Sequence, residues 1–224
     1  MSSPLLPFLE NPGLRATLAA FWEGGRYRNP ATGMAASIGI QQHLLSYHLY
    51  LALLGLKGEH AARASALAAY IAAAVREDGL LAEADGSLDS HPASACHVVD
   101  ALGTFCHYGA KVGATEAGIA AAREALLRIV AHHQAVRLPE GILGRTQQMR
   151  FELRAWYWAW RVTGEERYKE NCLALWKNGM AAYRHPIAHN GLLSQASFHP
   201  DYTWNYACGA GTTTEYATNT HTPV

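Results

Sequence analysis

The chain has 224 residues, half of them apolar, with a formal net charge of zero and a pI of about 7.2. This length can bury one sizeable core, so we expect a single domain over residues 1–224. The balanced charge argues against a nucleic-acid partner, and no apolar stretch is long enough to span a membrane.

Alanine is frequent and runs of β-branched residues are scarce, which favours long helices over strands. Apolar periodicity, with Gly, Pro and Asn at the breaks, predicts helices at about 12–23, 36–54, 59–77, 92–108, 115–136, 146–162 and 165–183. We therefore expect an all-α fold, in which residues 194–224 form a loop-rich C-terminal segment where an eighth helix would begin near Asp201.

Two turn signals alternate between these helices. One is Gly followed by two large aliphatic residues, at 79–81, 141–143 and 191–193, and the other is Gly followed by Glu, at 58–59, 113–116 and 164–165. The Gly suits a left-handed helix cap, and the Glu suits the first turn of the next helix. A helical-hairpin repeat with a period of roughly 50 to 60 residues accounts for both signals.

The helices fall into two kinds. Those at 59–77 and 115–136 are rich in Ala and Leu with scattered charges, as in an outer layer with one solvated face. Those at 36–54, 92–108 and 146–162 are more aromatic and less charged, and each carries a narrow polar stripe. We expect them to form an inner layer, with stripes made by His43, Tyr47 and Tyr50 and by Arg150, Arg154, Tyr157 and Arg161.

The segment Leu153–Ala174, with Thr163-Gly164-Glu165-Glu166-Arg167-Tyr168 at its turn, resembles the hairpins of α/α-toroid carbohydrate-active enzymes. These are the unsaturated glucuronyl hydrolases, N-acylglucosamine epimerases and toroid polysaccharide lyases. The loop from Asp78 to Ser87 and its continuation into 97–102 are similar to theirs as well. The resemblance is one of architecture, and no catalytic motif can be carried over residue by residue. It implies a partial α/α-toroid-like arc of about seven or eight hairpin helices.

One stripe of the 92–108 helix carries His97, Asp100, Thr104 and His107, spaced so that they share a face. The rest of this helix is apolar, so these groups must find partners or face a polar cavity. They are either satisfied polar residues of the core or one wall of a binding cleft.

Glycoside hydrolysis needs two carboxylates, about 5 Å apart for retention and about 6.5–9.5 Å apart for inversion. Asp100 is the best-placed general acid, because an apolar surrounding would raise its pKa. The alternative is that Asp100 pairs with an arginine such as Arg150 or Arg154. The other candidate carboxylates are Asp85, Asp89, Glu152 and Glu215.

β-Elimination on an acidic sugar needs a base and a group that neutralises the uronate carboxylate. His97 or His107 with Tyr108 would supply the base, and three arginines on one stripe would suit an anion unless they form ion pairs with neighbouring carboxylates. Epimerisation would use a similar set of residues. Aromatic and polar side chains that would contact the sugar are Trp156, Tyr202, Trp204, Asn205 and Tyr206. The last four lie in a segment that either closes the cleft or is a frayed tail.

The twelve histidines form no HExxH motif, and the four cysteines form no CxxC pair. We therefore expect no metal and no cofactor, with free thiols in a cytoplasmic protein. The predicted function is a lyase or hydrolase acting on an acidic sugar or oligosaccharide. The alternative is a non-catalytic helical scaffold that binds a saccharide or a protein on its concave face. Self-association into a homo-oligomer would cover the apolar ends of an open arc.

Overall fold

The computed structural model describes residues 12–89, 92–137 and 146–174, and this part of the chain is mostly helical. Its helices are α2 (Pro12–Ala20), α3 (Ile38–Leu53), α4 (Lys57–Ala74), α5 (Pro92–Tyr108), the short 3-10 helix η1 (Gly109–Val112), α6 (Glu116–Arg137), α7 (Thr146–Thr163) and α8 (Glu166–Ala174). The predicted helices at 36–54, 59–77, 92–108, 115–136 and 146–162 are confirmed to within a few residues.

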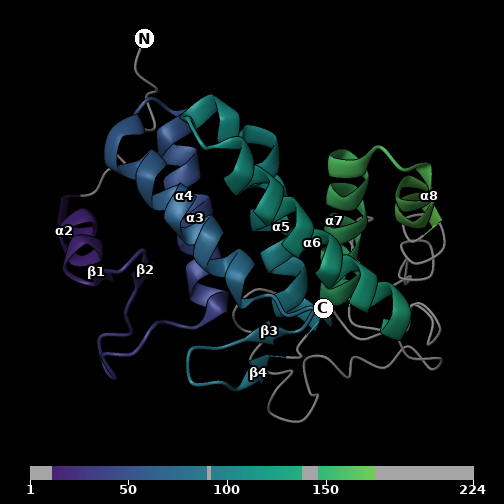
Figure 1. Cartoon of the computed structure of the whole chain (residues 1–224), viewed down its shortest axis with the longest axis horizontal. Coiled ribbons are helices and arrows are strands. Elements are labelled where there is room, and N and C mark those ends of the chain that lie inside the picture. Colours follow the sequence, from purple (N-terminus) through teal and green to yellow (C-terminus); the bar gives the residue numbers. More distant parts are fainter. Residues whose placement is uncertain (1–11, 90–91, 138–145, 175–224) are drawn as a thin grey trace, which may run out of the picture.

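Three helical hairpins follow one another along the chain, namely α3 with α4, α5 with α6 and α7 with α8 (Figure 1). Helix α5 packs between α3 and α7, and α4 packs against α6, so the helices of the two kinds lie in two layers. The core is the apolar surface between these layers, as the sequence pattern predicted. Its largest fully buried side chains are Trp156, Tyr27, Phe105, Ile38, Leu45, Leu49, Leu51, Leu67, Ile71, Leu81 and Leu102.

The turns between helices follow the Gly-and-Glu pattern with one correction. Gly113 and Gly164 adopt positive φ angles of 88° and 75°, as helix-ending glycines do. The turn between α3 and α4, however, uses Gly55 at φ 112°, whereas Gly58 lies inside α4. The prediction placed this turn three residues too late because Gly58 was read together with Glu59, which does lie in the first turn of α4.

Two short antiparallel hairpins interrupt the helices. Strands β1 (Trp22–Glu23) and β2 (Arg26–Tyr27) pair with Trp22 opposite Tyr27, so the predicted first helix at 12–23 is too long and ends at Ala20. Strands β3 (Leu81–Ala82) and β4 (Leu88–Asp89) pair with Leu81 opposite Asp89, in a region where a polar loop was expected.

The β3–β4 hairpin is joined to the start of α3 by Glu83. Both carboxylate oxygens of Glu83 accept the backbone N–H of Ile38, at 3.1 and 3.0 Å. The helix start carries unsatisfied N–H groups and a partial positive charge, so a carboxylate is the favoured partner there. A side chain 45 residues away thus caps a helix whose own N-cap residue, Ser37, makes no side-chain capping bond.

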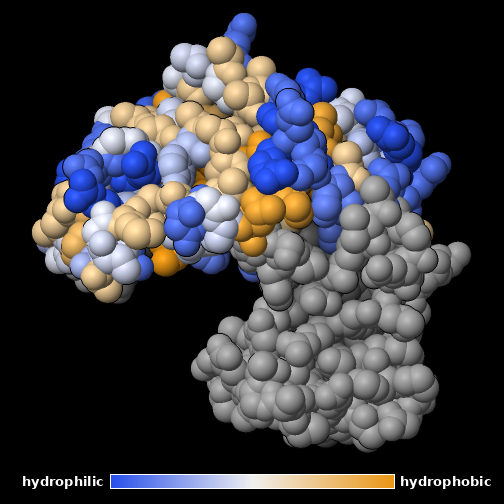
Figure 2. Space-filling model, turned by 60° about the horizontal axis from the view of Figure 1, so that its bottom comes forward, coloured by the Kyte–Doolittle hydropathy of each residue, from blue (hydrophilic) through white to orange (hydrophobic). Residues whose placement is uncertain are grey.

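The described surface is mixed in character. Hydrophilic residues cover much of the face in Figure 2, and strongly hydrophobic residues gather near the middle of that face. None of the described helices is long and apolar enough to cross a membrane.

Candidate functional site

Asp100 on α5 joins this helix to α7. Its Oδ2 accepts a hydrogen bond from an N–H of Arg154 at 3.1 Å, and its Oδ1 accepts one from the indole Nε1 of Trp158 at 2.7 Å. Arg154 and Trp158 are four residues apart on α7 and therefore lie on the same face of it. This is the arginine pairing that the sequence analysis set against a general-acid role for Asp100.

The two helices approach closely at this point because of Gly103. A Cβ atom at Gly103 would overlap the ring and the Cβ of Trp158. The missing side chain of Gly103 makes room for the indole, which is 8% exposed, and this packing holds its N–H against Asp100. The geometry of the candidate site therefore depends on one small residue on the next turn of α5.

His97 lies one turn before Asp100, and its ring centroid is 5.7 Å from that of His43 on α3. The pKa of His97 is lowered to about 4, chiefly by burial and also by the neighbouring His43 and Arg154, against the opposing effect of Asp100. The imidazole is consequently neutral at pH 7 and retains a lone pair able to accept a proton.

Thr104 and His107 continue the same face towards the end of α5. Thr104 is buried, and its hydroxyl donates to the backbone oxygen of Asp100 at 2.7 Å, so it is a satisfied helix residue. His107 is exposed, and its ring lies 6.2 Å from that of Trp158. Tyr108 contacts His107 edge to face. It lies eleven residues beyond His97, about 16 Å along the helix, so these two residues do not meet at one reacting atom.

The remaining predicted residues divide into three groups. Trp156 is 1% exposed and stacks on Tyr168, so it belongs to the core between α7 and α8. Asp85 is exposed and accepts bonds from the backbone and hydroxyl of Ser87, which stabilises the β3–β4 turn and lowers the pKa of its carboxyl group. The third group lies outside what the structure describes. The side chains of Asp89, Arg150 and Glu152 are not described, and neither are the residues Tyr202, Trp204, Asn205, Tyr206 and Glu215.

Sequence reasoning did not identify Trp158 as part of the site. Its spacing of four from Arg154 was the available signal, because an inner arginine and an indole N–H on one face can share a carboxylate. It also missed a second polar cluster entirely, the buried contacts among Tyr27, His48, His60 and Arg63. These residues lie on β2, α3 and α4, so no spacing pattern within one element could indicate that they meet.

Metal and thiol chemistry receive no support from the described side chains. Within the described part of the chain, no group of three or more His, Cys, Asp or Glu side chains is placed to hold a metal ion. Cys106 and Cys172 are free thiols. Burial raises the pKa of Cys106 to about 12, which makes it a poor nucleophile.

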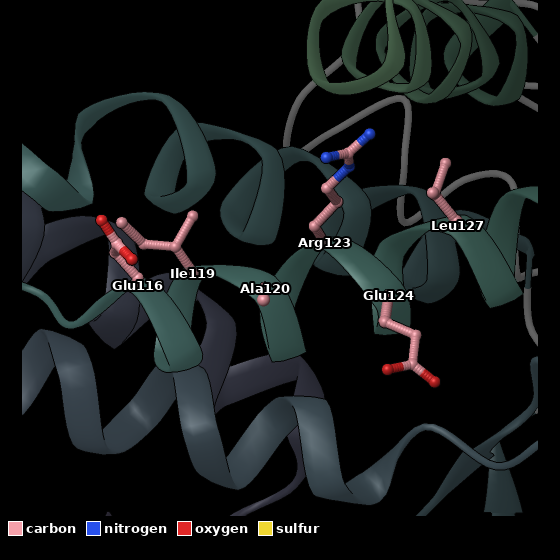
Figure 3. Close-up of a pocket in the computed structure, with 6 residues that line it drawn as sticks. All are labelled: Glu116, Ile119, Ala120, Arg123, Glu124 and Leu127. Carbon is pink, nitrogen blue, oxygen red and sulfur yellow. The ribbon is translucent and has the colours of Figure 1, made fainter.

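A hollow of about 410 Å³ lies on α6 (Figure 3). All six side chains in Figure 3 come from this one helix, with Ile119, Ala120 and Leu127 flanked by Glu116, Arg123 and Glu124. It gathers no paired catalytic groups, so the candidate site remains the face of α3, α5 and α7 that carries His43, His97, Asp100, Arg154 and Trp158.

No protein-family model, curated protein or solved structure matches this chain.

Proposed function

We propose that the chain is a carbohydrate-active enzyme of the α/α-toroid type that performs β-elimination on an acidic sugar. The observation that carries this proposal is a neutral imidazole beside a guanidinium. His97 is held neutral at pH 7. Asp100 lies three residues after it on α5 and pairs with Arg154 of α7. A base and an anion-binding group are the two components that elimination from a uronate requires.

In this reaction His97 removes the proton from C5 of the uronate ring, which becomes acidic when the adjacent carboxylate is neutralised. The electrons form the C4–C5 double bond, the C4–O bond breaks, and the departing oxygen takes a proton from solvent. Arg154 supplies the neutralising charge. The guanidinium of Arg154 has five N–H donors. Within the described residues, one of them is engaged by Asp100, which leaves others to bind a carboxylate.

Hydrolysis is less well supported than elimination. Both carboxylate oxygens of Asp100 already accept hydrogen bonds from α7, one from Arg154 and one from Trp158. Asp100 is better suited to orienting Arg154 than to protonating a leaving group. Epimerisation would begin with the same proton abstraction, and its product distinguishes it.

The alternative function is a non-catalytic scaffold that binds a saccharide on the same face. One observation favours it, since the two bonds of Asp100 tie α5 to α7 and would have a purely structural use. On this alternative, His97 would be a satisfied helix residue and Arg154 would still favour anionic ligands.

The two functions are separated by paired variants. For the enzyme, we expect His97→Ala to abolish product formation from uronate oligosaccharides while leaving their binding within a few-fold of wild type. Arg154→Ala should weaken binding of uronate sugars and leave neutral sugars unaffected. Arg123→Ala, on α6 and away from the site, is the matched control. Equal loss of both sugar classes in Arg154→Ala would contradict the anion-binding role.

A further inference from the structure

Residues 12–28, called the N-terminal arm below, rest on α3 and α4 through very few buried atoms. Helix α2 contains no buried residue. Within the arm, all of which the structure describes, Tyr27 is the one fully buried side chain, at 2% exposure. Leu18, Phe21 and Trp22 are partly buried against the core. The docking of the arm therefore depends on what holds Tyr27.

The backbone of Tyr27 is held by a side chain of α3. Gln41 accepts the backbone N–H of Tyr27 at 3.1 Å and donates to its backbone oxygen at 2.7 Å, as a neighbouring strand would. These bonds do not titrate. The hydroxyl of Tyr27, in contrast, enters a buried chain of ionisable groups.

That chain runs from Arg63 through Tyr27 and His48 to His60. Arg63 Nη1 lies 2.9 Å from the Tyr27 hydroxyl, this hydroxyl lies 2.5 Å from His48 Nε2, and His48 Nδ1 lies 2.7 Å from His60 Nδ1. His48 and His60 are 1% and 5% exposed. Arg63 also lies over the ring of Trp22, at 5.1 Å, and forms an ion pair with Glu59.

The direction of these bonds follows from the groups themselves. Arginine has no acceptor, so Arg63 donates to Tyr27. The buried hydroxyl hydrogen of Tyr27 then has His48 Nε2 as its acceptor, which places the ring proton of neutral His48 on Nδ1. That proton is donated to His60 Nδ1, which must be unprotonated. Each bond uses one hydrogen, and both histidines must be neutral.

An added proton therefore leaves one hydrogen of the chain without an acceptor wherever it binds. On His48 Nε2, it faces the hydroxyl hydrogen of Tyr27, and on His60 Nδ1, it faces the Nδ1–H of His48. We propose that this chain is a pH switch: protonation of its histidines at mildly acidic pH releases Tyr27 and detaches the N-terminal arm, while the hairpins from α3 to α8 stay folded.

The surrounding charges act in the same direction. The pKa of His48 is lowered to about 3, chiefly by burial and also by the adjacent His60 and Arg63. The ionisable groups that face His48 are Tyr27 from β2, Tyr47 from α3, and His60, Arg63 and Glu59 from α4, with Arg15 of α2 paired to Glu59. Glu59 is committed to these two arginines, so it does not offset a positive charge on His48.

The test is hydrogen exchange of the full chain, measured by mass spectrometry at about pH 7.5 and about pH 5 and corrected for intrinsic exchange. Detachment of the arm removes part of the burial of His48 and raises its pKa towards the ordinary value of 6.5, so each pH unit below that value favours detachment by up to about tenfold. We expect arm peptides to exchange faster at the lower pH, by up to roughly 30-fold. Peptides from α5 and α6 should stay far better protected than the arm at both pH values, because they exchange only when the hairpins unfold.

Three variants complete the experiment. His48→Gln keeps a donor and an acceptor but does not titrate, and it should lose most of the pH dependence of the arm. Tyr27→Phe lacks the hydroxyl and should exchange rapidly in the arm at both pH values, which covers the case where His48→Gln does not fold. His107→Gln, an exposed histidine outside the chain, should behave as wild type. An arm as well protected as α5 at about pH 5, or an unchanged pH ratio in folded His48→Gln, would overturn the proposal.

Discussion

The indole Nε1 of Trp158 on α7 donates a hydrogen bond of 2.7 Å to Oδ1 of Asp100 on α5, and the two residues are 58 apart in sequence. The same carboxylate pairs with Arg154, so one acidic side chain fixes the lateral position of two residues of α7. This relationship makes Asp100 a positioning residue for the arginine in the proposed reaction.

The bond between Trp158 and Asp100 is testable by a double-mutant cycle. Trp158→Phe removes the donor but keeps most of the ring, and Asp100→Ala removes the acceptor. We expect a coupling free energy of about 1 kcal/mol, because the bond is charge-assisted and partly buried. Urea unfolding of the four proteins measures it, and additive effects would mean that the two side chains do not interact.

Gly103 sets the distance between α5 and α7. We expect Gly103→Ala to reduce the free energy of unfolding by about 1–3 kcal/mol, because the new methyl group would overlap Trp158. Gly58→Ala is the control, since Gly58 lies in α4 with nothing near its missing Cβ. That change should be neutral or stabilise by up to about 1 kcal/mol. Similar effects at both positions would contradict the packing described.

Glu83 should stabilise the start of α3. Glu83→Ala removes both acceptors of the Ile38 N–H, and we expect a loss of about 0.5–2 kcal/mol in the free energy of unfolding. Glu77→Ala, an exposed glutamate nearby in sequence, should change stability by less than about 0.5 kcal/mol. Thermal unfolding of the two variants makes the comparison, and an equal effect would show that the capping bonds contribute nothing.

His97 should make the protein less stable in acid. Its pKa is lowered from 6.5 in the unfolded chain to about 4 in the folded protein, so the unfolded state binds more protons between these values. Stability from this residue is complete above about pH 6.5 and falls as the pH drops towards 4. The expected loss between neutral pH and pH 5 is about 2 kcal/mol.

Comparison of wild type with His97→Gln by urea unfolding at both pH values isolates this contribution. The variant should lose correspondingly less stability on acidification. If the two proteins lose the same amount, His97 is not held neutral by its surroundings.

The helices were predictable because their signals are local. Pro92 at the first position and the apolar run through Phe105 fixed α5 to the residue, and Glu116 marked the first turn of α6. The hairpins β1–β2 and β3–β4 were missed, since strands of two residues have no periodicity to detect. Their turns did carry signals, at Gly24-Gly25 and Asp85-Gly86, which suggested only loops.

The site was predictable only in part, for a similar reason. The spacing of His97 and Asp100 placed both on one face of α5, and the arginine stripe supplied Arg154 as a partner. No pattern indicated that Gly103 would admit Trp158, or that His48 and His60 would meet across α3 and α4. Such contacts depend on how helices pack, which single-helix periodicity does not contain.

The most direct test of the proposed function is incubation of the wild-type protein with uronate and neutral oligosaccharides. Absorbance of a new C4–C5 double bond and the release of reducing ends are followed in parallel. The proposal predicts new absorbance with uronate substrates alone, lost in His97→Ala. Reducing ends without absorbance would mean hydrolysis and contradict the assigned role of His97, and no product from any substrate would favour the binding scaffold.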